Sequence, residues 1–292
     1  MVLVNGWYFK MSEKKYNMFA GCSFTWGQGL WSYYKTDEYI PTVTQYITNE
    51  LRIPEDAYEF RKKVRWPQLV SNEIGGTPLI KKLNGGTDYE SYEQINKWLV
   101  EYNPNEIEYL VFQTTQLYRS PFPFKLGDKL YHLRSTPNFK NLTRVDLVKY
   151  QNEFHIEYEN DNVGIDYFYE WLIENNLDIF DFENIHREYV IKCIENVFIK
   201  CENLGIKTYL LSWTDEYLKS IYNNPFLLDR FITFEYNGNV YDCIEKMQME
   251  NNHLYIKFDN KNKIHDDGGD LHPSIECHEV IANSVLKKIK NG

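Results

Sequence analysis

The stretch from residue 16 to residue 23 constrains the fold of this chain more than any other. Residues 16–21 form a short, largely apolar run that ends in a glycine, which is typical of a buried strand. Ser23 follows directly, in a turn flanked by Gly21 and Gly27. Because open α/β sheets place their ligands at the carboxyl ends of their strands, Ser23 is expected at the ligand-binding edge of such a sheet.

Strands and helices alternate along the rest of the chain. Buried strands are also expected at 79–83, 107–113 and 206–212. Helices are expected at 66–73, 183–204 and 274–290. A further helix is expected to follow Asp88, whose carboxylate would cap it. This alternation is typical of α/β proteins, so we predict a mostly parallel central sheet with right-handed crossovers.

Three segments interrupt this order and are interpreted as long insertions in a single domain that spans 1–292. Residues 31–64 are irregular and aromatic, with a helix expected around 42–51. Residues 117–181 contain scattered prolines and acids. We interpret this second segment as a lid or cap, because long loops in compact domains are often functional. Residues 231–258 are expected to form a small antiparallel β insertion with a hairpin.

The composition argues against several classes of function. The 292 residues carry a formal net charge of −10, which argues against a nucleic-acid partner held by phosphate contacts. The short basic cluster Arg61-Lys62-Lys63 is interpreted as a solvated helix face. The five cysteines have no C-x-x-C spacing, which argues against a disulfide framework and a zinc site. With no apolar stretch near the ~18 residues of a membrane span and no signal peptide, a soluble cytoplasmic protein without a membrane partner is expected.

A carboxylate and an imidazole lie almost side by side near the end of the chain, at Asp270 and His272. A serine hydroxyl is a weak nucleophile until a base takes its proton and a third group orients that base. Ser23, His272 and Asp270 can fill these roles if the fold brings both terminal segments to one sheet edge. The structural alternatives are a turn serine that caps the following helix and a loop histidine that caps the last one.

Other motifs fail at specific positions around Ser23. A phosphate-binding loop requires Lys-Ser or Lys-Thr after its glycines, and neither follows Gly29. A dinucleotide fingerprint requires glycine where Ser32 stands, and the nucleophile elbow of α/β-hydrolases requires glycine where Thr25 stands. The histidines and aspartates within 265–278 have neither zinc-helix nor calcium-loop spacing, so neither a metal nor another cofactor is expected.

The residues around Ser23 resemble those of the SGNH family, the GDSL-type esterases and acyltransferases. The family's first block reads Gly-Asp-Ser, followed by a threonine and glycines. The matching residues here are Gly21, Ser23, Thr25, Gly27 and Gly29, with Cys22 in place of the aspartate. The sequence Gly-Cys-Ser-Phe-Thr at 21–25, together with Trp-Pro-Gln-Leu at 66–69, looks most like that of SGNH-like proteins of marine phages and bacteria. The resemblance implies a flavodoxin-like fold, a three-layer α/β/α sandwich.

The resemblance also implies an oxyanion hole. The family's second block supplies a glycine N–H, best matched by Gly86 with Gly85 as the alternative. Its third block, Gly-x-Asn-Asp, aligns with residues 113–116, where the asparagine amide is missing. Thr115 would offer only a hydroxyl, and Gln116 would offer an amide from a neighbouring position. Losing one oxyanion donor can cost about 2.7 to 4 kcal/mol of transition-state stabilisation. The missing asparagine is therefore expected to mean a slow enzyme or an inactive one.

The family's last block, Asp-x-x-His, would place the triad acid at Gly269. Asp270 is the nearest acid and is the expected one, with Asp267 as the alternative. The resemblance therefore implies a serine esterase that forms an acyl-enzyme on Ser23, with a small acyl group on a carbohydrate as the expected substrate. The alternatives are an O-acyltransferase with the same triad and a catalytically silent binding or structural module of the same fold.

Overall fold

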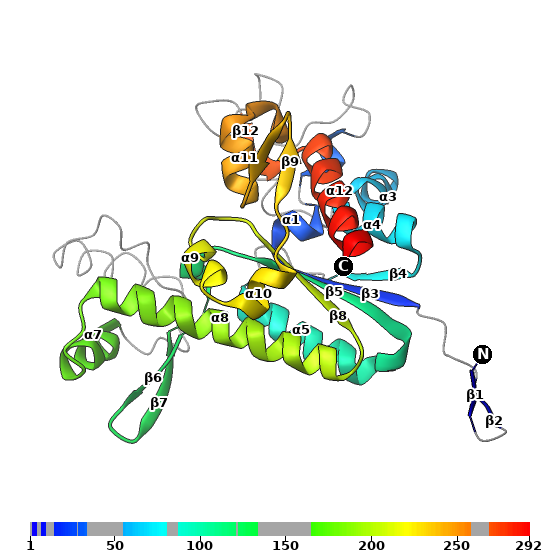
Figure 1. Ribbon diagram of the computed structural model, residues 1–292. Helices are drawn as coiled ribbons and strands as arrows, with labels where there is room; N and C mark the ends of the chain where they lie inside the picture. Colours follow the sequence, from blue (N-terminus) through cyan, green and yellow to red (C-terminus); the bar gives the residue numbers. More distant parts are fainter. Residues whose placement is uncertain are drawn as a thin grey trace.

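A four-stranded parallel sheet with the strand order β4-β3-β5-β8 forms the centre of the protein (Figure 1). The structure is a computed structural model and describes residues 2–4, 7–9, 15–27, 29–33, 55–80, 87–120, 122–133, 165–257 and 269–292. The central strands are β3 (Tyr16–Ala20), β4 (Thr77–Ile80), β5 (Ile107–Thr114) and β8 (Lys207–Ser212). Each neighbouring pair is parallel, so the predicted α/β class with a parallel central sheet is confirmed.

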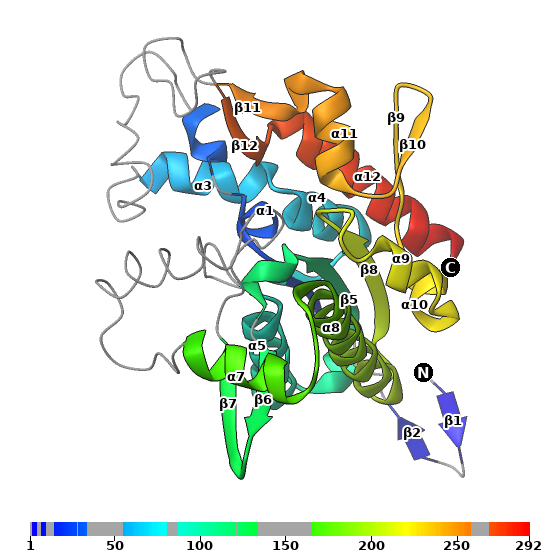
Figure 2. The same cartoon turned by 90° about the vertical axis from the view of Figure 1, so that its left-hand side faces the viewer.

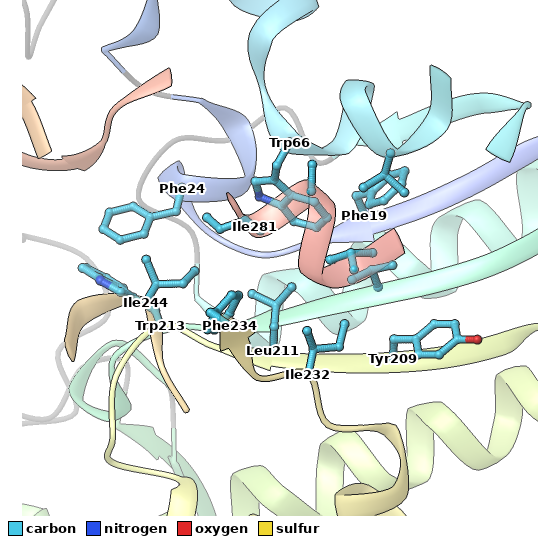
Figure 3. Packing of buried hydrophobic residues seen from close by; sticks show 14 of the residues in the cluster. Phe19, Phe24, Trp66, Tyr209, Leu211, Trp213, Ile232, Phe234, Ile244 and Ile281 are labelled. Atoms are coloured by element: carbon cyan, nitrogen blue, oxygen red, sulfur yellow. The ribbon is translucent and has the colours of Figure 1, made fainter. Parts of the chain in front are cut away.

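Helices cover both faces of this sheet (Figures 1 and 2). The helices are α4 (Trp66–Ile74) and α12 (Ile275–Asn291) on one face, and α5 (Asp88–Glu101) and α8 (Ile179–Asn203) on the other. Successive strand residues point to opposite faces, so neighbours along one strand enter different hydrophobic clusters. Phe19 and Leu211 pack under α4 and α12, as Figure 3 shows, whereas Met18 and Leu210 pack against α5 and α8.

Local signals set where these helices begin. Pro67 occupies the first turn of α4, where its missing N–H costs no helical hydrogen bond. Helix α5 begins with a capping box, in which the Thr87 hydroxyl accepts from the Glu90 N–H at 3.1 Å and the Glu90 carboxylate accepts from the Thr87 N–H at 2.9 Å. The prediction that Asp88 caps this helix is therefore wrong. Asp88 is the first helical residue, and its carboxylate accepts hydrogen bonds from residues outside α5.

The remaining elements surround the sheet. The further helices are α1 (Ser23–Trp26), α3 (Glu55–Val64), α7 (Ile165–Glu174), α9 (Leu218–Tyr222), α10 (Pro225–Arg230) and α11 (Ile244–Glu250). The further strands are β1 (Val2–Val4), β2 (Trp7–Phe9), β6 (Phe122–Leu126), β7 (Lys129–Leu133), β9 (Phe234–Tyr236), β10 (Asn239–Tyr241), β11 (Tyr255–Lys257) and β12 (Gly269–Pro273). Short 3₁₀ turns within the described residues are Leu30–Tyr33, Pro104–Glu106, Leu117–Arg119 and Asn252–Leu254. These peripheral strands pair only as antiparallel couples, separately from the central sheet.

The segments interpreted as insertions are described in part. The helix expected around 42–51 lies outside the described residues. Within 117–181, β6 and β7 form a hairpin and α7 follows. Within 231–258, β9 and β10 form a hairpin, and α11 adds a helix to what the sequence suggested as strands. No helix among the described residues is long and apolar enough to cross a bilayer.

Candidate active site

The fold brings Ser23 and His272 into contact across 249 positions of sequence. Ser23 opens α1 immediately after β3, and His272 lies in β12, which leads into α12. The Ser23 Oγ and the His272 Nε2 are 2.9 Å apart, a hydrogen-bonding distance for a nucleophile and its base. Ser23 is buried and His272 is half-buried. The serine and histidine predicted from opposite ends of the chain therefore form a pair.

Two glycines permit the tight turn that carries Ser23. A Cβ atom on Gly21 would lie 2.2 Å from the Thr25 Oγ1, so any larger residue would displace the turn. Gly27 ends α1 with φ of 79°, in the left-handed region that favours glycine, and its N–H donates to the Ser23 carbonyl at 2.9 Å. The glycine spacing is therefore required by the geometry of this turn.

Gln113, at the end of β5, fastens this turn to the sheet. The Thr25 hydroxyl donates to the Gln113 Oε1 at 3.0 Å, and the Gln113 Nε2 donates to the Cys22 Sγ at 3.1 Å. Burial raises the pKa of the Cys22 thiol, so the thiol stays protonated near neutral pH and is a poor nucleophile. The flanking side chains thus hold the backbone, while the Ser23 hydroxyl bonds to His272.

Aromatic side chains border the pair. The Phe24 ring meets the His272 ring edge to face, with centroids 5.2 Å apart. The Trp213 ring, just beyond β8, lies 4.1 Å from the Phe24 ring, and the Arg119 guanidinium lies 5.3 Å from the Trp213 ring. Phe24 and Trp213 also belong to the core cluster on the α4 and α12 side (Figure 3). This packing restrains the imidazole from one side.

The other predicted site residues are described in part. Asp270 lies in β12, where its backbone is paired with Ile256 of β11. Its side chain lies outside what the structure describes, as do Asp267, Gly85 and Gly86. The assignment of the triad acid and of the glycine oxyanion donor therefore stays a prediction.

Thr115 and Gln116 lie just after β5, where the resemblance to the SGNH family predicts an oxyanion donor. Thr115 is buried; its N–H donates to the Asp88 Oδ1 at 3.1 Å and its hydroxyl to the Gln116 carbonyl at 3.3 Å. Both donors of Thr115 are thus engaged. Gln116 is half-buried, and its Oε1 has no hydrogen-bond partner. Among the described residues, the Ser23 N–H takes part in no backbone hydrogen bond outside α1.

Asp88 is the residue near the site that the sequence did not identify. Its fully buried carboxylate accepts from the Thr115 N–H at 3.1 Å, from the Ser120 hydroxyl at 2.8 Å and from the Tyr217 hydroxyl at 3.1 Å. These partners are 27, 32 and 129 positions away. Asp88 therefore ties the start of α5 to the turn after β5 and to α9.

The basic cluster at 61–63 is not a uniformly solvated face. Arg61 is fully buried, with its guanidinium 4.4 Å from the centroid of the Trp26 ring and 4.6 Å from that of Tyr58. The interpretation of Arg61 as a solvated residue is therefore wrong. The reason is that α3 turns Arg61 toward Trp26, in the helix that carries Ser23. No group of three metal-binding side chains occurs in the part of the chain that the structure describes.

Two buried histidines are expected to make the protein less stable in acid. Burial lowers the pKa of His278 to about 3 and that of His186 to about 4. An unfolded histidine titrates near 6.5, so below about pH 6.5 the unfolded chain binds protons that the folded chain refuses. The free energy of unfolding should then fall by up to about 1.4 kcal/mol per pH unit for each histidine, down to its folded pKa. Urea unfolding between pH 7 and pH 5 measures this slope.

A matched pair of variants isolates the contribution of one ring. His186→Gln should reduce the slope, whereas His253→Gln, at an exposed ring, should leave it close to that of the native protein. An unchanged slope in His186→Gln would show that this ring is not held neutral.

Comparisons with known proteins return no match among family models, curated proteins or solved structures. A buried serine hydroxyl hydrogen-bonded to an imidazole, at the carboxyl end of a parallel strand, has the arrangement needed for nucleophilic attack on a carbonyl carbon.

Proposed function

We propose that this chain is a serine esterase of the SGNH type, with a three-layer α/β/α sandwich as its fold. The observation that carries the proposal is the 2.9 Å contact between the Ser23 Oγ and the His272 Nε2. The glycine turn that presents Ser23 and the aromatic packing around His272 support it. The substrate class we propose is an ester of a small acyl group, with a carbohydrate as the alcohol.

The proposed reaction follows from the positions of these two side chains. The His272 Nε2 takes the proton of Ser23 as the Oγ attacks the acyl carbonyl, and the ring then gives that proton to the departing alcohol. The Ser23 N–H, together with the N–H of Gly86, stabilises the oxyanion. Water, activated by the same imidazole, cleaves the acyl-enzyme to the free acid. Asp270, or alternatively Asp267, orients the imidazole, and no cofactor takes part.

A catalytically silent binding module is the second candidate function. The observation that favours it is the engagement of both Thr115 donors, which leaves no replacement for the family's asparagine at that position. An O-acyltransferase would use the same serine and histidine and would differ in admitting an acceptor hydroxyl in place of water. Covalent labelling separates the silent module from both enzymes.

We expect a fluorophosphonate probe to form one covalent adduct, on Ser23. The hydrogen bond to His272 should activate this hydroxyl above all other serines. Intact mass and peptide mapping measure the adduct. Ser23→Ala should abolish it, while Ser71→Ala should label like the native protein, because Ser71 is an equally buried serine in α4.

The labelling experiment also decides against the proposal if it fails. No adduct on Ser23, under conditions that label a control esterase to completion, would leave the silent module as the better account. An adduct that persists in Ser23→Ala would place the nucleophile elsewhere.

A further inference from the structure

Two arginines flank the helix that carries Ser23. Arg61 lies in α3, and Arg65 lies one turn later at the start of α4. Their guanidinium carbons are 4.4 Å and 5.3 Å from the centroid of the Trp26 ring. A Cβ atom on Gly27 would lie 3.0 Å from the Cβ of Arg65, so this arginine touches the end of the Ser23 turn. Figure 2 shows α1 close to α3 and α4.

The guanidinium of Arg65 is buried without a matching acceptor. Arg65 is 7% exposed, and its Nε and Nη1 atoms have no hydrogen-bond partner. No carboxylate of the described residues forms an ion pair with it, and Glu59, an acid that interacts with it electrostatically, is bound to Lys62. Burial, together with the positive charge of Arg61, lowers the pKa of Arg65 to about 10, so it is still charged at neutral pH. A buried charge without a counterion is costly, which argues that a ligand supplies one.

His278, in α12, adds a third buried donor. It is fully buried in α12, and its Nδ1 accepts from the Trp66 N–H at 3.2 Å. The proton of the neutral ring is therefore on Nε2, which is buried and has no hydrogen-bond partner. His278 interacts electrostatically with both Arg65 and His272, so it lies near the arginine and near the catalytic imidazole.

Arg61, Arg65 and His278 form what we call the donor cluster. Arg65 and His278 carry buried N–H groups that have no hydrogen-bond acceptor, and Arg61 adds a second positive charge. An anion that carries several oxygens satisfies such donors, and guanidinium groups match carboxylates and phosphates in geometry as well as in charge. A neutral apolar ligand would leave the same donors unsatisfied.

We propose that the donor cluster binds a carboxylate or phosphate group beside Ser23, and that this group belongs to the ester substrate. The claim that the anion is part of the substrate rests on the proposed function, because it requires that Ser23 is acylated by an ester. It narrows the substrate class to anionic esters, in which the charged group lies on the alcohol or acyl portion within reach of Trp26. The claim that an anion binds here depends only on the donor cluster.

Inorganic phosphate is the first probe. At equal ionic strength adjusted with sodium chloride, phosphate up to about 50 mM should raise the melting temperature of the full-length protein progressively, because ligands that bind the folded state stabilise it. Arg65→Gln should lose this shift, and Arg65→Lys should weaken phosphate binding by about tenfold, since lysine lacks the planar fork. Arg187→Gln, at an arginine of α8 that is bonded to Asn184, should retain the native shift.

The melting temperature without phosphate provides a second readout. Arg65→Gln removes a buried charge, so its melting temperature without phosphate should equal or exceed that of the native protein. A variant that keeps its melting temperature but shows no phosphate shift is folded and has lost the anion site. A variant that fails to fold would instead lose the melting transition itself. The absence of any phosphate-specific shift in the native protein would overturn the proposal.

A matched pair of esters tests the source of the anion. The two esters share one acyl group and differ only in a carboxylate or a carboxamide on the alcohol. The native protein should prefer the carboxylate ester by at least about tenfold in kcat/KM, and Arg65→Gln should lose this preference. Phosphate binding without any ester preference would overturn the substrate assignment and leave a site for a free ion. Phosphate binding without Ser23 labelling would overturn the proposed esterase and keep the anion site.

Discussion

His272→Gln is expected to slow the acylation of Ser23 by at least about a thousandfold. The Ser23 hydroxyl is hydrogen-bonded to the His272 Nε2 at 2.9 Å, and glutamine can occupy the same space without acting as a base near neutral pH. The residual rate should come from the Ser23 N–H and the other oxyanion donors, which the substitution leaves in place. The second-order rate constant for fluorophosphonate labelling, followed by intact mass, measures the effect.

The same substitution at another histidine provides the control. His253 is exposed and contacts the Tyr236 hydroxyl at 2.6 Å, so His253→Gln should label at the native rate. Both variants should unfold within about 1 kcal/mol of the native protein, because neither ring is fully buried. A His272→Gln variant that labels within about tenfold of the native rate would show that Ser23 has another base or needs none.

The central fold could be predicted because its signals are local. β3, β5 and β8 are short apolar runs, and the turn after β3 is closed by contacts between residues only a few positions apart. Gly21 approaches Thr25, and Gly27 bonds back to Ser23, so the spacing of these residues encodes the turn. The nearness of Ser23 and His272 does not follow from the order of the central strands, because His272 lies in β12, which pairs with β11 outside that sheet.

The partners of Asp88 could not be predicted because no local pattern specifies them. An aspartate at a helix start is a common cap, and nothing in the neighbouring sequence shows that Thr87 takes that role. The Tyr217 hydroxyl that bonds to Asp88 lies 129 positions later, beyond β5 and α8. Arg61 was misjudged for a similar reason. Two lysines follow it, but its burial is decided by Trp26, 35 positions earlier.

The position of Asp88 changes the account of the oxyanion hole. In the SGNH pattern that the residues around Ser23 resemble, the third block supplies an oxyanion donor. Here the Thr115 N–H points instead to the Asp88 carboxylate, so this turn is held by the protein's own acid. Asp88 therefore holds the turn after β5 in place through its bonds to Thr115 and Ser120. If the chain is the proposed esterase, we expect its oxyanion to be stabilised chiefly by the N–H groups of Ser23 and Gly86.

Asp88→Ala is expected to lower the free energy of unfolding by about 3 to 5 kcal/mol. The substitution leaves the Thr115 N–H and the Ser120 and Tyr217 hydroxyls buried without their acceptor. Each unsatisfied buried donor costs about 1 to 3 kcal/mol, less whatever relaxation recovers. Urea unfolding measures the loss. Asp229→Ala, at an exposed aspartate, should change stability by no more than about 0.5 kcal/mol.

A double-mutant cycle tests whether this loss arises from the hydrogen bonds to Asp88. Tyr217→Phe alone removes one donor from a charged acceptor and should cost about 1.5 to 3 kcal/mol. In the Asp88→Ala background it should cost at least about 1 kcal/mol less, because the hydroxyl has already lost its acceptor. Equal costs in both backgrounds would mean that the bond contributes no stability. A large coupling would show that a buried carboxylate, rather than helix capping, is the reason for an aspartate at this position.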